Sequence, residues 1–257
     1  MEDEGAMLRR KRLLYAFAMC TCMLGFVGCE NNENISMEQK KNNTLIVDNS
    51  NLEDLEEKVE ENRIKEVIKS EYNDIAKLVN KEFSLEKGYK PHDLVVPNVR
   101  LYCSANEERS HLRYEAAEAL EEMFKAADSE GIELYLVSAF RSSGYQEGLY
   151  NNSLARKGQE YTDRYIAKPN HSEHQTGLVA DISTRGMNFE LEPHFRHTEE
   201  GKWLANNAHK YGFILRYKEG REDDTGYSYE PWHFRYVGKE LSEYIYKNDL
   251  VLEDLYK

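Results

Sequence analysis

Cysteine is scarce in this chain of 257 residues, and its placement excludes a disulfide-stabilised fold. Only four cysteines occur, and three of them, Cys20, Cys22 and Cys29, lie near the N-terminus. Cys103 is the one cysteine in the body of the chain, so we expect no internal disulfide once the N-terminus is processed. The chain also has no CxxC pair and no other cysteine-rich metal motif.

Positive charge is in the minority as well. Lys and Arg number 34 against 47 Asp and Glu, which gives a formal net charge of −13. A protein that binds nucleic acid through phosphates needs a basic surface, so we exclude nucleic acid as a partner. Hydrophobic residues make up 40% of the chain and aromatic residues 11%, which is enough for a packed core.

The N-terminal region has the pattern of an export signal. A basic cluster at Arg9–Arg12 is followed by Leu13–Gly28, which carries no charge. This apolar stretch is short for a membrane-spanning helix, which needs roughly 20 apolar residues. It ends in Phe26-Val-Gly-Cys29, which resembles the lipidation site of bacterial lipoproteins. We therefore expect residues 1–29 to be an export signal, Cys29 to carry a lipid, and the remainder to lie outside the cytoplasmic membrane. An uncleaved signal anchor is the alternative.

Residues 30–71 are expected to connect this signal to the folded domain. The segment Glu30–Ser50 is rich in Asn, Glu and Lys, a composition typical of a disordered tether. Between Leu52 and Ile68 apolar residues recur at helical spacing among charged ones, which predicts a solvated helical stalk. Residues 72–257 then form one domain.

Helical and extended patterns alternate along this domain. We expect helices over 112–127, 145–157 and 203–211 and from 238 onward, and strands over 132–137, 178–182, 213–217 and 229–237. The last two strands are separated only by a turn at 221–228. Neighbouring strands joined by a turn favour an antiparallel pair, so the prediction is an α+β fold with a small antiparallel sheet and flanking helices.

The segment 171–183 (HSEHQTGLVADIS) combines groups that packing alone rarely requires. His174 precedes Asp181 by a short loop in which Gly177 permits an unusual backbone turn. Asp181 lies between Ala180 and Ile182 in a short apolar strand, where a carboxylate is costly to bury unless it is paired or binds a metal. Taken alone, this segment fits either a metal site or a structural hydrogen bond between His174 and Asp181.

A second candidate motif is Glu230-Pro-Trp-His233. Pro231 excludes Glu230 from helical backbone and fixes the entry into the next strand. An edge strand with an aromatic patch is the bland interpretation. Combined with His174 and Asp181, however, His233 would complete a tetrahedral zinc site with one position open for water, and Glu230 would be the base beside that water.

A third motif is the segment 138–146 (SAFRSSGYQ). Arg141 follows the end of a predicted strand, and its planar guanidinium suits a terminal carboxylate held by two parallel hydrogen bonds. Gln146 could bind an amide or a carboxylate oxygen. On its own, a solvent-facing arginine in a Ser/Gly loop is the better interpretation of this segment.

Together the three motifs resemble the VanY-type D-alanyl-D-alanine carboxypeptidases, zinc peptidases that trim peptidoglycan stem peptides. The family pattern Ser-x-His-x-x-Gly-x-x-x-Asp is matched by Ser172 to Asp181, and Glu-x-x-His by Glu230 to His233. The resemblance implies that His174, Asp181 and His233 bind one zinc ion, that Glu230 is the general base, and that Arg141, Gln146 and Ser172 hold the C-terminal end of the stem. The chain departs from relatives at Asn170-His171, and we interpret His171 as a residue at the rim of the site.

The resemblance implies a zinc D,D-carboxypeptidase that removes the C-terminal D-Ala of a stem peptide, and with the N-terminal pattern we expect it to be a monomer tethered to the membrane. An L,D-carboxypeptidase acting on tetrapeptide stems is the alternative within the same class. A wall-binding protein on an inactive peptidase scaffold is the alternative from another class. A second metal at His194 and His197 has no third ligand in the sequence.

Overall fold

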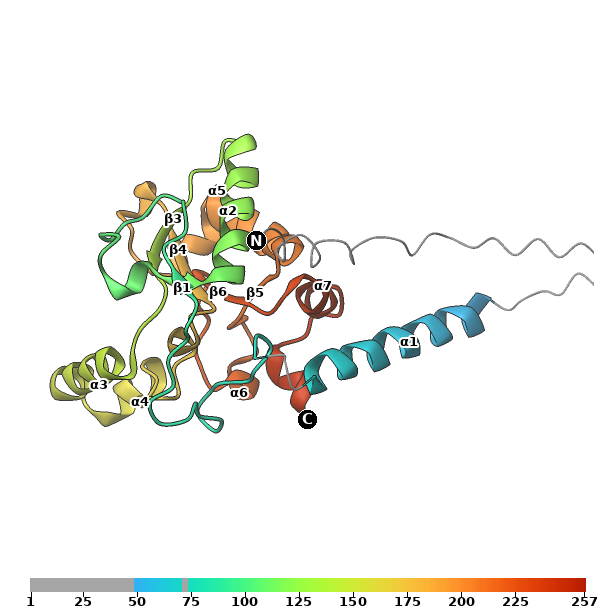
Figure 1. Ribbon diagram of the computed structural model, residues 1–257, viewed down its shortest axis with the longest axis horizontal. Coiled ribbons are helices and arrows are strands. Elements are labelled where there is room, and N and C mark those ends of the chain that lie inside the picture. Colours follow the sequence, from blue (N-terminus) through green and yellow to red (C-terminus); the bar gives the residue numbers. More distant parts are fainter. Residues whose placement is uncertain (1–48, 71–73) are drawn as a thin grey trace, which may run out of the picture. The chain divides into compact units, whose positions relative to one another are not determined.

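The computed structural model describes residues 49–70 and 74–257 of the chain (Figure 1). The predicted export signal, the lipidation site Cys29 and most of the predicted tether lie outside these residues, as does the predicted start of the domain at residue 72. Within the described part, no helix combines the length and the apolar character that a membrane span requires.

The main sheet has four antiparallel strands, which confirms the predicted α+β fold with a small antiparallel sheet. Its spatial order is β3-β4-β6-β5, and a separate two-stranded ladder joins β1 to β2. The strands are β1 (Leu94–Val95), β2 (Leu112–Arg113), β3 (Tyr135–Ser138), β4 (Val179–Ser183), β5 (Phe213–Leu215) and β6 (His233–Tyr236).

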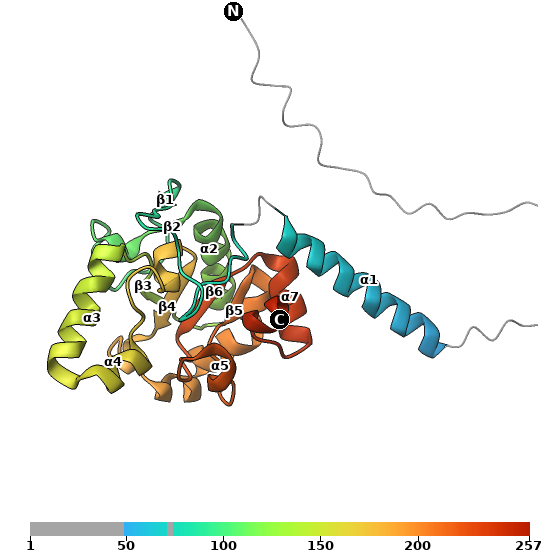
Figure 2. The same cartoon turned by 90° about the horizontal axis from the view of Figure 1, so that it is seen from below.

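Helices flank this sheet, and α3 and α4 lie side by side in both views (Figures 1 and 2). The helices are α1 (Asn49–Lys69), α2 (Tyr114–Ser129), α3 (Ser143–Lys157), α4 (Gln159–Tyr165), α5 (Glu199–Asn207), α6 (Glu222–Thr225) and α7 (Lys239–Lys247). Short 3-10 turns occupy Glu108–Ser110, Glu173–Thr176, Arg185–Met187, Pro193–His197, Ala208–Tyr211 and Leu252–Tyr256.

Several predicted boundaries differ from the structure. The helix predicted from residue 112 begins at Tyr114, because Leu112 pairs with Val95 in the β1-β2 ladder. The strand predicted over 229–237 is shorter, because His233 N–H donates to the Glu230 carbonyl in a turn, so that β6 begins only at His233. The strand predicted over 132–137 is displaced to Tyr135–Ser138.

The two faces of the sheet have different chemistry because side chains alternate along each strand. Leu136, Ala180 and Phe234 lie on one face and pack in a buried apolar cluster with Leu120 and Met123 of α2. This apolar cluster is the main core of the domain. It leaves the opposite face of the sheet available for polar side chains.

Polar side chains form a row across that opposite face. Ser138 of β3 pairs with Asp181 of β4, and Asp181 pairs with His233 of β6. Arg216 extends the row beyond β5, since its N–H donates to the His233 carbonyl at 3.2 Å. All four side chains are buried. The sheet thus brings an acid, an imidazole and a guanidinium together inside the protein.

The predicted helix over 52–68 is present as α1. Ile64 of α1 is buried in a second apolar cluster with Leu241 and Ile245 of α7. The exposed ion pair between Lys247 and Glu60 adds little, because such pairs contribute about 0–1 kcal/mol. The role of α1 as a stalk remains a prediction.

Candidate metal centre and active site

Asp181 and His233 approach each other because of the register between β4 and β6. The two residues are direct partners, and the Ile182 N–H donates to the Trp232 carbonyl at 2.9 Å just beside them. This pattern makes Asp181 and His233 a non-hydrogen-bonded pair, the kind in which cross-strand side chains lie closest. A third group, His174, comes from the 3-10 turn at Glu173–Thr176 that precedes β4.

Gly177 lets the chain turn from His174 into β4. It ends the 3-10 turn in left-handed backbone at φ 69°, which residues with side chains rarely adopt. A Cβ at this position would also lie 2.8 Å from the Leu94 side chain. Both the conformation and the space therefore require glycine here, as the sequence motif predicted.

The three side chains present their ligand atoms to one point. His174 Nε2 lies 3.2 Å from Asp181 Oδ2, and His233 Nδ1 lies 3.2 Å from Asp181 Oδ1. The candidate ligand atoms of these three buried residues all lie within 4.8 Å of one another. Asp181 Oδ1 has no hydrogen-bond partner within the described residues. Two imidazoles and one carboxylate are a donor set typical of catalytic zinc, so these residues fit that ion.

The protonation equilibria of these groups also favour a cation at this point. Burial lowers the pKa of His174 to about 4, which keeps its imidazole neutral. Burial by itself would lower the pKa of His233, but its contacts with the carboxylates of Asp181 and Glu173 raise it to about 9. Burial opposes ionisation of Asp181, yet His174, His233 and Arg141 hold its pKa well below the usual range. The carboxylates around His233 thus attract a positive charge.

Contacts behind the two imidazoles fix their orientation. His174 Nδ1 donates to the Ala139 carbonyl at 2.6 Å, which leaves Nε2 as the atom that can bind a metal. His233 has the opposite arrangement, because its Nε2 faces Glu173 Oε2 at 3.5 Å and its Nδ1 faces Asp181. In each candidate histidine ligand, the ring nitrogen that does not face Asp181 therefore faces an oxygen of another residue.

Glu173 belongs to a buried charge network that the sequence analysis missed. Its Oε1 accepts hydrogen bonds from Arg216 Nε at 2.8 Å and from Arg235 Nη1 at 2.7 Å. Arg216 in turn donates two hydrogen bonds of 2.7 Å to Glu253. The side chains of Glu173, Arg216 and Arg235 have no exposed surface. The sequence offered one sign of this network, which is that a charged residue, Glu173, directly precedes His174.

Glu230 lies beside the three candidate ligands. Its Oε2 is 3.5 Å from His233 Nδ1, and its backbone is fixed by the turn to His233 and by an N–H that donates to the Tyr217 carbonyl. Burial raises the pKa of Glu230 to about 7, although the nearby His233 opposes the shift. A carboxylate in this position can accept and return a proton near the metal point.

The residues expected to hold substrate share one small pocket with these groups. Arg141, Gln146 and Ser172 line it together with His174, Glu230 and His233. Arg141 Nη2 donates to Asp181 Oδ2 at 2.7 Å, and its Nε donates to Ser138 Oγ at 3.1 Å. Gln146 donates its amide N–H to the Ala167 carbonyl, whereas its buried Oε1 has no partner within the described part of the chain. The structure thus brings all seven predicted site residues together.

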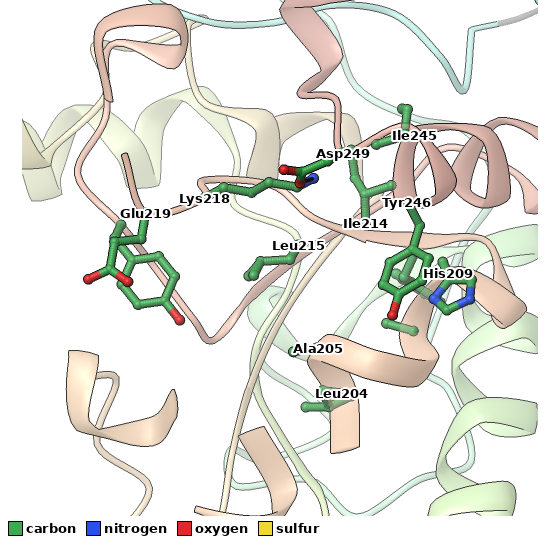
Figure 3. Close-up of a pocket in the computed structure, with 13 residues that line it drawn as sticks. Leu204, Ala205, His209, Ile214, Leu215, Lys218, Glu219, Ile245, Tyr246 and Asp249 are labelled. Carbon is green, nitrogen blue, oxygen red and sulfur yellow. Dashed lines mark hydrogen bonds and ion pairs between the residues drawn. The ribbon is translucent and has the colours of Figure 1, made fainter. Parts of the chain in front are cut away.

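Other candidates lie apart from this pocket. A larger pocket of about 510 Å³ lies between β5, α5 and α7, and none of its lining residues belongs to the three motifs (Figure 3). The rings of His194 and His197 are 5.4 Å apart, but neither belongs to the three-residue metal cluster. His171 lines a neighbouring pocket, in agreement with its interpretation as a rim residue.

Comparison with known proteins gives consistent matches. A family model described as D-alanyl-D-alanine carboxypeptidase (VanY) matches residues 109–239. A protein of Bacillus subtilis (strain 168) that carries the provisional name carboxypeptidase YodJ is 46% identical over 192 residues, or 75% of this chain and 70% of that protein. The structure of the LdcB LD-carboxypeptidase aligns with a TM-score of 0.67 and 47% identity, and covers 70% of this chain and 84% of that one. A mutant of the D,D-pentapeptidase VanY in complex with Zn(II) aligns with a TM-score of 0.57 and 29% identity, and covers 72% and 99%.

The buried network predicts a large effect of replacing Glu173. Glu173→Gln preserves the shape of the side chain but leaves Arg235 without its carboxylate partner. We expect the free energy of unfolding to fall by about 3 kcal/mol, the low end for a broken buried ion pair, because Glu253 still pairs with Arg216. Urea denaturation measures this change. The exposed Glu222→Gln is the matched control and should change stability by less than about 0.5 kcal/mol. Equal stabilities of the two variants would contradict the role of the network.

Proposed function

The chain belongs to the D-alanyl-D-alanine carboxypeptidase (VanY) family, and we propose that it is a zinc-dependent enzyme that removes the C-terminal D-Ala from peptidoglycan stem peptides. One observation supports this proposal above the others. His174 and Asp181, from one segment, and His233, which lies far from them in sequence, converge on one point with the carboxylate of Glu230 beside them.

In this proposal His174 Nε2, Asp181 and His233 Nδ1 hold one zinc ion. When bound, zinc lowers the pKa of a water ligand to about 7 and polarises a carbonyl oxygen. Ala139 and Glu173 keep the two imidazoles oriented. A substrate that enters the pocket meets His174, His233 and Glu230 in its lining.

Glu230 would be the general base of hydrolysis. Its carboxylate takes a proton from the attacking water and returns it to the nitrogen of the leaving D-Ala, a role that contributes roughly 10²–10⁴ in rate. Arg141 has donors beyond those used by Asp181 and Ser138, and it would hold the terminal carboxylate of the stem with Ser172 and Gln146. Binding of the stem's terminal carboxylate at Arg141 would place the last amide bond of the stem next to Glu230.

The residue before the cleaved bond separates the two candidate specificities. A D,D-carboxypeptidase removes D-Ala from a D-residue at the end of a pentapeptide, whereas an L,D-carboxypeptidase removes it from an L-centre at the end of a tetrapeptide. The L,D alternative gains support from the 47% identity to the LdcB LD-carboxypeptidase, against 29% to the VanY D,D-pentapeptidase. The VanY family model supports the D,D activity.

We also propose that the enzyme works outside the cytoplasmic membrane as a monomer tethered through Cys29. The basic cluster, the uncharged stretch and Cys29 at the N-terminus support this location. Peptidoglycan stems lie on that side of the membrane. A lipid tether would keep the domain near newly made precursors.

Incubation of the soluble domain with tetrapeptide and pentapeptide stems tests the activity and the specificity. We expect release of free D-Ala from at least one of the stems, which mass spectrometry identifies. A chelator should abolish the release and added Zn²⁺ should restore it, because the proposed hydrolysis needs the water that the metal activates. Release that persists in the zinc-free protein would exclude the proposed mechanism.

Replacement of Glu230 separates an enzyme from a binding protein. Glu230→Ala should reduce kcat by about 10²–10⁴ while zinc content, measured by mass spectrometry of the metal, stays at one ion per chain. Glu219→Ala, a change at an exposed site outside the active-site pocket, is the control and should retain wild-type turnover. Full activity of Glu230→Ala would show that another group is the base.

Lipidation is tested with labelled fatty acid in cells that produce the full chain. We expect label on the wild-type protein and its recovery in the membrane fraction. Cys29→Ser should remove the label, whereas Cys22→Ser should keep it. Label on the Cys29→Ser protein would refute Cys29 as the lipid site.

A further inference from the structure

A second pocket adjoins the proposed active site and carries an excess of positive charge. It has a volume of about 250 Å³ and is lined by Lys81, Asp163, Ile166, Ala167, Lys168 and His171. Two lysines and an imidazole around one carboxylate are unusual in a chain with a net charge of −13. A local basic site in an acidic protein indicates an anionic ligand.

This basic pocket shares a wall with the active-site pocket. Ile166 and Ala167 line both of them. His171 directly precedes Ser172, a predicted substrate residue. The Lys81 ammonium lies 4.6 Å from the centre of the Tyr227 ring, and Tyr227 also lines the active-site pocket. A peptide bound at Glu230 can therefore reach the basic pocket with a neighbouring residue.

The two lysines are available to a ligand. Within the described residues, neither the Lys81 nor the Lys168 ammonium forms a hydrogen bond or an ion pair. The one carboxylate of the pocket, on Asp163, already accepts hydrogen bonds from Tyr150 at 2.5 Å and from Gln159 at 2.6 Å. Positive charge in the pocket is thus only partly compensated.

The third polar group is held in place by backbone contacts. His171 Nδ1 donates to the Asn80 carbonyl at 2.8 Å, which leaves Nε2 for a ligand. The His171 N–H donates to the Lys168 carbonyl at 3.0 Å, so both residues belong to one turn, in which Asn170 has a φ of 68°. The Leu85 N–H donates to the Asn170 carbonyl at 2.7 Å and ties this turn to the loop after Lys81.

We propose that the basic pocket binds a carboxylate of the stem peptide that lies before the cleaved bond, and that Lys81 and Lys168 thereby select acidic stems over amidated ones. This inference rests on the proposed function. Two carboxylates of a stem could be the ligand: the α-carboxylate of its γ-linked D-glutamate, or the second carboxylate of a diaminopimelate at the third position. Both offer the same chemistry to an ammonium group.

Matched substrates and a charge-removing variant test the selection. The substrates are stems of the length that the enzyme hydrolyses, tetrapeptide or pentapeptide, with D-glutamate or D-isoglutamine at the second position and lysine or diaminopimelate at the third. We expect wild-type kcat/KM to favour a stem with the free carboxylate roughly ten-fold over the matched stem that lacks it, the effect of one charged hydrogen bond. In the K81M/K168M variant that ratio should fall to about one. The exposed K125M, on α2, should keep the wild-type ratio.

The pattern across the four stems identifies the carboxylate. A ratio that depends on the second position assigns the D-glutamate, and one that depends on the third assigns the diaminopimelate. A wild-type ratio of one at both positions, or an unchanged ratio in K81M/K168M, overturns the proposal.

A binding measurement separates this proposal from the proposed function. Calorimetry on zinc-loaded Glu230→Gln protein reports affinity for the same four stems without turnover. Tighter binding of the acidic stems, lost in the additional K81M/K168M background, supports the basic pocket even if the wild-type protein releases no D-Ala. Equal affinity for acidic and neutral stems overturns it, whatever the wild-type protein hydrolyses.

Discussion

The pairing of Asp181 with His233 across β4 and β6 is the constraint on which the rest of the site depends. The two residues face each other only in the observed register, in which Ala180 pairs with Phe234 on the opposite, apolar face. A shift of one residue would exchange the faces and place the carboxylate in the hydrophobic core. The apolar packing of Leu136, Ala180 and Phe234 against α2 therefore fixes the position of the candidate metal ligands, which lie on the other face of the sheet.

A site built on the polar face of a buried sheet has to compensate the charges it removes from water. The carboxylate of Glu173 lies against His233, Arg216 and Arg235 compensate the charge of Glu173, and Glu253 pairs with Arg216. Apolar residues of similar volume could stabilise the fold as well, because buried ion pairs regain little more than their desolvation cost. The network of Glu173, Arg216, Arg235 and Glu253 is better explained by its effect on the orientation of the His233 ring. It keeps the Nδ1 atom of His233 directed at Asp181, a geometry that a rotating imidazole would lose.

Features of the fold that depend on a local sequence pattern could be predicted, whereas features that depend on contacts between distant residues could not. The α+β class, the end of α3 at Gly158 and the turn at Gly177 follow from periodicity and backbone freedom. The segment 171–183 alone does not distinguish a metal site from a His174–Asp181 hydrogen bond. The distinction requires the register between β4 and β6, which brings His233 next to Asp181. Leu112 fits the helical spacing of the residues that follow it, and only its pairing with Val95 shows that it belongs to a strand. Arg235 lies in β6 and Arg216 directly follows β5, and only the fold shows that both meet Glu173 inside the protein.

The proposed metal ligands and the residues of the pocket wall lie on different kinds of structure. This difference explains why the three motifs do not distinguish D,D- from L,D-specificity. Asp181 and His233 lie on strands of one sheet, and His174 directly precedes it, so their positions follow from its register. The groups around them, such as Ile166, Ala167 and His171, lie in the loop between α4 and β4. Loops accept changes of sequence and length that a sheet does not. Relatives can therefore keep the same metal ligands while the walls of the pocket change. In the proposed enzyme, these walls contact the residue before the cleaved bond, so D,D- or L,D-specificity depends on their shape and charge.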